Sequence, residues 1–289
     1  MSARVVVARS LDDALSALAD ADEHAHVLAG GTDLMVELRT GRTRPSLVVD
    51  IWKLAELRGV REDSAGLRLG ALTTCAEIVR SERLRGHCEL LATACAEVGA
   101  EQIQQRATLG GNLGTASPAA DIVPALMALG ASVRLVSRSA SRDVALEDFC
   151  VGYRRTARRP DELIESVHVP FRPRGERCAF RKVGTRRAQS ISKLVVALAL
   201  ELEGARIVAA RGAAGSVAPR TLRLAALERE LLGARVSREL CLRAAAAAAR
   251  EDVQPIDDLR SSAGYRRQVL ARVLHSLLCD LTGVDACPS

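Results

Sequence analysis

Two pairs of consecutive glycines constrain this chain more than any other feature. Gly30 and Gly31 lie in "LAGGTDL", and Gly110 and Gly111 lie in "TLGGNLG". Glycine reaches positive φ and carries no Cβ, so successive N–H groups can converge on an anion. A tight turn is the other explanation for a lone Gly-Gly pair. Because a helix N-terminus stabilises an exposed anion by only about 0.3–1 kcal/mol, two converging segments would hold a diphosphate better than one.

The second pair stands in the more polar surroundings. Asn112, Thr115 and Ser117 add hydrogen-bonding groups, and Pro118 stiffens the exit. Asp121 sits where a helix begins, and a simple N-cap would also explain it there. The stretch "TLGGNLGTASPAAD" is therefore predicted to be a polar loop that binds a ligand. No G-x-G-x-x-G follows the first strand and no G-x-x-x-x-G-K-[ST] occurs, which disfavours a Rossmann dinucleotide site and a P-loop.

The order of patterns predicts an α+β fold in three parts. Residues 1–52 read as a small β-α-β unit, with a helix starting at Ser10 and a β-branched strand near residues 46–51. Residues 53–172 alternate strands and helices and form a mixed α+β subdomain. Residues 173–289 give three strand patterns and then a helical block from Thr221, which predicts an antiparallel sheet covered by a helical bundle.

Composition argues against several classes of protein. The net charge is +6, but the 41 basic residues include only three lysines and are scattered, and aromatic residues make up 2%, so stacking platforms for bases are scarce. The eight cysteines form no C-x-x-C and no tight group, so we expect no iron-sulfur or zinc site in this chain. No export signal and no membrane-spanning apolar run is visible, which predicts a cytoplasmic protein with reduced, buried cysteines.

Two segments give the chain a specific resemblance. "LAGGTDLMVELRTG", from Leu28, and "EQIQQRATLGGNLGTASPAADIVPAL", from Glu101, resemble the FAD-binding medium subunit of the molybdenum hydroxylases, the xanthine dehydrogenase and carbon monoxide dehydrogenase family. "DELIESVHVP" and "CAFRKVGTRRAQSISKL" follow in the order of that family, so the resemblance covers nearly the whole chain. It implies that the first two parts form a flavin-binding domain.

The resemblance also implies a set of FAD-binding residues. The first glycine segment would wrap the diphosphate, the second would form the opposite wall, Asp121 would bond the polyol or ring region, Ile164 would lie against the flavin and Lys182 would contact the cofactor. The expected cofactor-binding residues are Leu28, Ala29, Gly30, Gly31, Thr32, Asp33, Leu34, Thr108, Leu109, Gly110, Gly111, Asn112, Thr115, Ser117, Asp121, Ile164 and Lys182. No catalytic acid or base is assigned, because flavin reoxidation by hydride transfer requires none.

The function that the resemblance implies depends on partner chains. A molybdenum-cofactor (molybdopterin) subunit would hydroxylate a substrate, an iron-sulfur subunit with [2Fe-2S] clusters would pass the electrons on, and FAD in this chain would deliver them to NAD or another acceptor. A free-standing FAD-dependent oxidoreductase acting directly on a small molecule is the alternative. A basic nucleotide- or nucleic-acid-binding module without redox activity is a third hypothesis, centred on "RPRGERCAFRKVGTRR" from Arg172.

The chain departs from the family pattern of animal xanthine dehydrogenases in two places. Those proteins carry acidic residues after the paired arginines near the flavin, whereas Ala188, Gln189 and Ser190 follow here. Val98 occupies the position of an aromatic flavin neighbour. The lower negative charge near the flavin leaves the identity of the electron acceptor open. The side chain of Val98 is smaller than an aromatic ring, which predicts a flavin that is less covered by protein.

Overall fold

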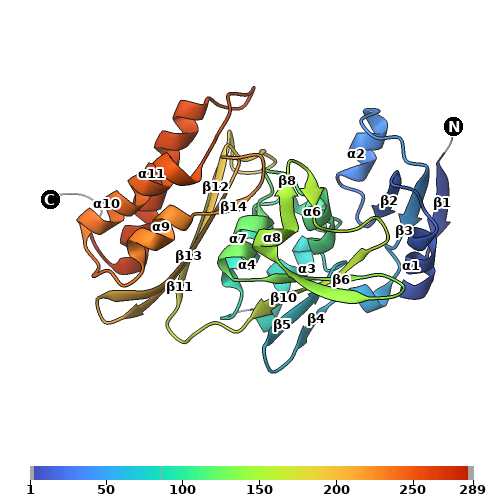
Figure 1. Cartoon of the computed structure of the whole chain (residues 1–289), viewed down its shortest axis with the longest axis horizontal. Coiled ribbons are helices and arrows are strands. Elements are labelled where there is room, and N and C mark those ends of the chain that lie inside the picture. Colours follow the sequence, from blue (N-terminus) through green and yellow to red (C-terminus); the bar gives the residue numbers. More distant parts are fainter. Residues whose placement is uncertain (1–2, 85, 286–289) are drawn as a thin grey trace.

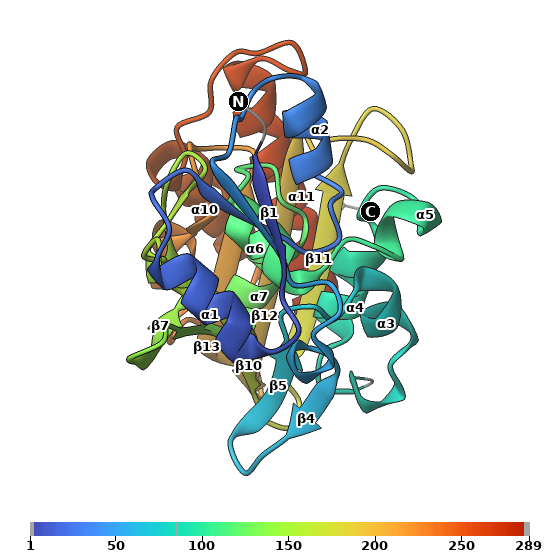
Figure 2. The ribbon, with the colours of Figure 1, turned by 90° about the vertical axis from the view of Figure 1, so that its right-hand side faces the viewer.

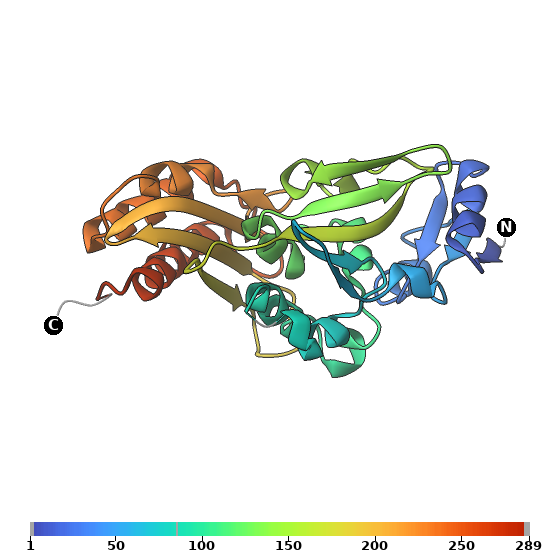
Figure 3. The same cartoon turned by 90° about the horizontal axis from the view of Figure 1, so that it is seen from below.

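The computed structural model describes residues 3–84 and 86–285, which form an elongated molecule (Figure 1). The N-terminal unit lies at one end of the long axis and the C-terminal helices lie at the other. Seen from below, the C-terminal sheet and the central sheet follow one another along this axis (Figure 3). The predicted α+β class is confirmed, while the domain limits at residues 52 and 172 stay predictions.

The N-terminal unit is the predicted β-α-β arrangement. Its three strands are parallel in the order β1-β3-β2, and Figure 2 looks onto this unit from its end of the molecule. Ser10 caps the first helix by accepting a hydrogen bond from the Asp13 N–H. The elements are β1 (Arg4–Val7), α1 (Leu11–Ala19), β2 (Ala25–Leu28), α2 (Leu34–Arg39) and β3 (Leu47–Asp50).

The central region contains a five-stranded antiparallel sheet in the order β4-β5-β10-β6-β7. Thr74 and Glu77 form a capping box at the start of α3. The elements are η1 (Ala55–Leu57), β4 (Val60–Glu62), β5 (Gly66–Gly70), α3 (Cys75–Arg80), η2 (Glu82–Leu84), α4 (Glu89–Ala96), α5 (Glu101–Gln104), α6 (Leu109–Thr115), α7 (Ile122–Ala128), β6 (Ser132–Val136), β7 (Ser141–Ala145), α8 (Leu146–Phe149), β8 (Cys150–Gly152), β9 (Arg155–Thr156) and β10 (Leu163–Pro170).

The C-terminal region is an antiparallel sheet with helices on one face, as predicted. Leu194, Val196 and Leu198 pack on the helices, whereas Ala197 belongs to the central core, next to α7. Both faces of β12 are therefore buried, and this joins the two regions. The elements are β11 (Arg177–Val183), β12 (Leu194–Glu203), β13 (Arg206–Gly215), β14 (Leu222–Arg223), α9 (Ala225–Leu231), α10 (Arg238–Ala247), the π-helical turn η3 (Ala248–Asp252) and α11 (Ala263–Thr282).

The prediction of a polar loop at "TLGGNLGTASPAAD" is wrong for the first half of the stretch, which forms helix α6. Thr108 accepts a hydrogen bond from the Gly111 N–H and so caps the helix, and Ala116 ends it in the left-handed conformation. Each glycine disfavours a helix by about 1 kcal/mol relative to alanine. Complete burial of Leu109 and Leu113 offsets that cost.

The remaining sequence predictions concern cysteines and membranes. Seven cysteines are free, and all but the half-buried Cys178 are buried, as small apolar residues would be. The eighth, Cys287, lies outside the described residues. Across residues 3–84 and 86–285, no helix combines the length and the apolar character needed to cross a bilayer.

Candidate functional site

The connection between β2 and α2 presents a row of unused hydrogen-bond donors. We call residues 29–34 the first glycine loop; all six are half-buried, and Gly31 adopts φ +78°. None of their six backbone N–H groups donates a hydrogen bond to any residue that the structure describes. Half-buried N–H groups are normally paired with protein or water, so consecutive free ones favour an external acceptor such as a phosphate.

The two glycine segments meet, as predicted. A Cβ on Gly30 would lie 1.6 Å from the carbonyl oxygen of Arg106, so only glycine allows the two backbones to pack this closely. The Arg106 Nε donates to the Gly30 carbonyl oxygen at 3.3 Å. The Thr115 hydroxyl donates to the Asp33 carboxylate at 3.1 Å. Residues far apart in the sequence therefore form one continuous wall.

The second glycine pair uses its backbone donors inside the protein. The Leu109 N–H donates to the carbonyl oxygen of Thr73 at 3.0 Å, and the Gly110 N–H donates to that of Ala71 at 2.8 Å. The next two N–H groups donate to the hydroxyl and the carbonyl oxygen of Thr108, each at 3.0 Å. The N–H groups of residues 109–112 are therefore all used within the protein, which argues against the inference that this segment binds a diphosphate through them.

Gly110 has a packing role instead. A Cβ there would lie 2.7 Å from the Cβ of Ala71, closer than side chains approach. A Cβ on Gly111 would meet only the Thr108 hydroxyl, at 2.8 Å. Thr108 and Leu109 are buried, which leaves their side chains little surface for a ligand.

Two buried acceptors near the second pair lack a hydrogen-bond partner within the described residues. They are the side-chain oxygens Asn112 Oδ1 and Asp121 Oδ1. The Ser117 hydroxyl is engaged, since it accepts from the Ala119 N–H at 3.3 Å. An unpaired buried acceptor costs about 1–3 kcal/mol, so both orphaned oxygens favour a bound donor.

Asp121 and Lys182 form a buried ion pair between the central and C-terminal regions. The Lys182 Nζ donates to Asp121 Oδ2 at 2.6 Å and to the Glu97 carbonyl oxygen at 2.7 Å, and the lysine side chain is 4% exposed. Burial raises the pKa of Asp121 to about 6, while the ammonium group opposes the shift. Asp121 begins α7 without capping it, so the simple N-cap interpretation is wrong.

Ile164 lies beneath α6 and is largely covered by protein. It is 6% exposed and belongs to the central core. Its Cδ1 atom would be 3.8 Å from a Cβ placed on Gly114, and the register of β10 shifts between Ile164 and Ser166. The remaining expected residues lie half-buried in the first segment: Leu28, Ala29, Thr32 and Leu34. Which of the expected residues touch a cofactor stays a prediction.

Three residues beside the first glycine loop were not expected from the sequence. Arg154 adopts φ +51° in the turn between β8 and β9 and pairs with Asp33 at 3.6 Å and with Glu37. The Arg106 guanidinium carbon lies 3.7 Å from the centre of the Trp52 ring. These contacts join residues far apart in the chain, so no local motif could reveal them. Only Trp52 could have drawn attention in the sequence, because it is the single tryptophan of the chain.

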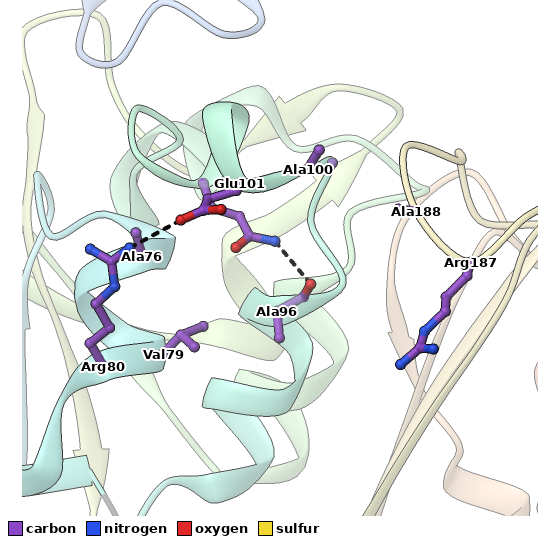
Figure 4. A pocket seen from close by; sticks show the side chains of 10 residues that line it. Ala76, Val79, Arg80, Ala96, Ala100, Glu101, Arg187 and Ala188 are labelled. Carbon is purple, nitrogen blue, oxygen red and sulfur yellow. Dashed lines mark hydrogen bonds and ion pairs between the residues drawn. The ribbon is translucent and has the colours of Figure 1, made fainter.

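The two departures from the family pattern lie next to each other. The Gln189 N–H donates to the carbonyl oxygen of Gly99, the residue after Val98, at 2.9 Å. A cavity of about 410 Å³ opens beside this contact (Figure 4), and Arg80 and Glu101 pair at 3.3 Å on one wall while Arg187 faces them. The lining residues are Ala76, Val79, Arg80, Ala96, Gly99, Ala100, Glu101, Gln104, Arg187 and Ala188.

Two family models match the chain. Residues 1–172 match the family "FAD binding domain in molybdopterin dehydrogenase", and residues 179–280 match "CO dehydrogenase flavoprotein C-terminal domain". The chain is 33% identical to the 6-hydroxypseudooxynicotine dehydrogenase complex subunit alpha of Paenarthrobacter nicotinovorans, covering 94% of this chain and 92% of that one. It is 32% identical to the glyceraldehyde dehydrogenase medium chain of Sulfolobus acidocaldarius, covering 92% and 93%.

A solved structure has the same fold as this chain. Carbon monoxide dehydrogenase from Hydrogenophaga pseudoflava superimposes with a TM-score of 0.92 at 26% identity, covering 96% of each chain. The free donors of the first glycine loop and the two orphaned acceptors are groups that FAD, with its diphosphate, hydroxyl and ring N–H groups, can satisfy. This chain belongs to the family of FAD-binding medium subunits of molybdenum hydroxylases, which are oxidoreductase subunits of the xanthine dehydrogenase and carbon monoxide dehydrogenase type.

Proposed function

We propose that the chain holds FAD as the electron-transfer subunit of a molybdenum hydroxylase complex. It would take electrons from [2Fe-2S] clusters on an iron-sulfur subunit, while a third chain carries the molybdenum cofactor and hydroxylates the substrate. NAD or another molecule would accept the electrons. The names of two relatives support the proposal, because both relatives match this chain almost from end to end and both are named as dehydrogenase subunits.

One observation of this chain carries the assignment of FAD: the six N–H groups of the first glycine loop find no acceptor in the part of the chain that the structure describes. A diphosphate offers oxygens enough to accept from several of them, and backbone donors need no side-chain charge. Asn112 Oδ1 and Asp121 Oδ1 would accept from hydroxyl or ring N–H groups of the same molecule. When bound, FAD supplies redox chemistry that takes up electrons singly and releases them singly or as hydride.

The buried ion pair has a proposed role in orienting the cofactor. The Lys182 Nζ makes two hydrogen bonds within the described residues, and we propose that its third N–H donates to the flavin. Because the ammonium group comes from β11, the C-terminal region would complete a site that the first two regions begin. The loop at residues 184–190 follows the same strand, and we propose that the electron acceptor approaches next to it.

The complex is proposed to work in the cytoplasm. Seven free cysteines, six of them buried, suit a reducing compartment.

Co-purification of the native complex tests the proposed function. We expect a yellow protein that releases FAD on denaturation and contains molybdenum, iron and FAD in fixed ratio with two partner chains. Colourless protein that takes up no FAD would overturn the assignment of the cofactor. FAD bound to a chain that copurifies with no metal-containing partner, and that turns over a small molecule alone, would establish the free-standing oxidoreductase instead.

A further inference from the structure

The first glycine loop is flanked by two arginines with different electrostatic surroundings. Arg154 is neutralised, since Asp33 and Glu37 both pair with it. Arg106 has no carboxylate within 4.0 Å among the residues that the structure describes, although it touches Gly30. Its positive charge is therefore the uncompensated one beside the six free N–H groups.

Two contacts fix the direction of the Arg106 side chain. Its Nε donates to the Gly30 carbonyl oxygen at 3.3 Å, and its guanidinium carbon lies 3.7 Å from the centre of the Trp52 ring. Arg58 holds Trp52 in turn: its guanidinium carbon lies 4.3 Å from the ring centre, and it donates to the Trp52 carbonyl oxygen at 2.9 Å. The platform under Arg106 is thus held by protein contacts and needs no ligand.

The donors of Arg106 are only partly used. The Nε group is bonded, but the two terminal amino groups donate no hydrogen bond within residues 3–84 and 86–285. A guanidinium fork with four free N–H bonds matches the oxygens of a phosphate, which it binds in a bidentate manner.

We propose that Arg106, stacked on Trp52, is a phosphate-binding residue of the first glycine loop and supplies the one cation that contacts the diphosphate of the bound dinucleotide. The inference rests on the proposed function, because it takes FAD as the ligand of that loop. It also accounts for the absence of positive charge in "TLGGNLGTASPAAD": the charge stands two residues before that stretch, at Arg106.

The dissociation constant of FAD, measured by flavin fluorescence with the full-length chain stripped of flavin, tests the proposal. Arg106→Gln should weaken FAD binding about 10- to 30-fold at low salt, the loss expected for a charge-assisted bond. Trp52→Leu should weaken it about 2- to 5-fold through loss of the stacking platform. Arg243→Gln is the matched control, since it removes an equal charge from an exposed ion pair on α10, at the far end of the molecule.

Salt separates a charge effect from damage to the loop. Raising the salt concentration screens an exposed cation, so the ratio of the wild-type and Arg106→Gln affinities should shrink. An Arg106→Gln affinity equal to wild type, or a loss that does not change with salt, would overturn the inference. Failure of the wild-type chain itself to bind FAD would instead overturn the proposed function.

Discussion

The two Gly-Gly pairs of this chain look alike in sequence and act differently. Around Gly30 and Gly31 the backbone leaves six consecutive N–H groups without an acceptor among the described residues. Around Gly110 and Gly111 it forms helix α6, and the four N–H groups of residues 109–112 are all bonded within the protein. The first pair therefore offers donors to a ligand, whereas the second shapes the wall that faces it.

The two pairs show that an anion site is better located from the backbone N–H groups that lack an acceptor than from the glycine motif. A glycine can be required for a positive φ that leaves N–H groups free, or for the close approach of two segments of the chain. Gly30 and Gly110 share the second requirement, since a Cβ on either would collide with a neighbouring segment. Only the first segment also has a glycine with positive φ, Gly31, beside N–H groups that stay free within the described residues.

The largest effect is expected from the ion pair of Asp121, at the end of the second segment. There the groups available to a ligand are on side chains, whereas in the first segment they are backbone N–H groups. Lys182→Met leaves the buried Asp121 carboxyl without its cation, and breaking a buried pair costs about 3–5 kcal/mol. The free energy of unfolding in urea should fall by about this amount. Lys193→Met is the control: that lysine lies 5.4 Å from the Tyr265 ring, a contact worth at most about 1 kcal/mol. Equal losses in the two variants would contradict the buried pair.

The next effect breaks the contact between the two segments. Gly30→Ala places a Cβ against the Arg106 carbonyl oxygen, so the backbones must separate, at a cost of about 1–3 kcal/mol. We expect FAD affinity to fall more than about 100-fold, since the donors of the loop lose their arrangement. In Gly264→Ala the new Cβ meets nothing within 4 Å, and neither stability nor affinity should fall. Undiminished FAD binding by Gly30→Ala would show that the two segments do not act together.

The Asp121 carboxyl should give the unfolding free energy of the flavin-free protein a pH dependence. Its pKa is raised from 3.8 to about 6 on folding, so the native state binds the proton more tightly than the unfolded chain. This contribution stabilises the protein near pH 4 and is lost as pH rises through 6, with a slope of at most about 1.4 kcal/mol per pH unit. The Asp121→Asn protein should lack this slope in urea titrations. Parallel curves for both proteins would contradict the assignment.

The smallest effect separates the two members of the second pair. Gly110→Ala inserts a Cβ 2.7 Å from that of Ala71, and we expect a net loss of about 1 kcal/mol after the gain in helix propensity. Gly111→Ala meets only the rotatable Thr108 hydroxyl, so its stability should stay within about 0.5 kcal/mol of wild type. Thermal unfolding of both variants measures the difference. A greater loss for Gly111→Ala would contradict the packing role of Gly110.

Much of the fold could be predicted because local patterns are strong here. The Ser10 cap starts a helix where expected. The helical block expected from Thr221 begins only at Ala225, because Leu222 and Arg223 form β14, which pairs with β13. Helix α6 was missed because three glycines and a threonine have low helix propensity. Its stability comes from the burial of Leu109 and Leu113, which only the tertiary structure provides.

The meeting of the two segments could be predicted, and the separate use of their backbone donors could not. The convergence of the segments at Gly30 and the pairing of Asp33 with Thr115 agree with the expectation of a two-sided site. The free donors could be assigned to one side only after the carbonyl partners of residues 109–112 were known. Arg106 and Arg154 could not be found from the sequence, because their contacts with the loop depend on how distant segments pack.

Hydrogen exchange of the backbone amides, measured by mass spectrometry with and without FAD, tests the difference between the two glycine pairs directly. Without FAD, amides of residues 29–34 should exchange fast and those of residues 109–112 slowly, because only the latter are hydrogen-bonded. Saturating FAD should slow residues 29–34 at least about 10-fold. Unchanged exchange at residues 29–34, with new protection at residues 109–112 instead, would contradict the account.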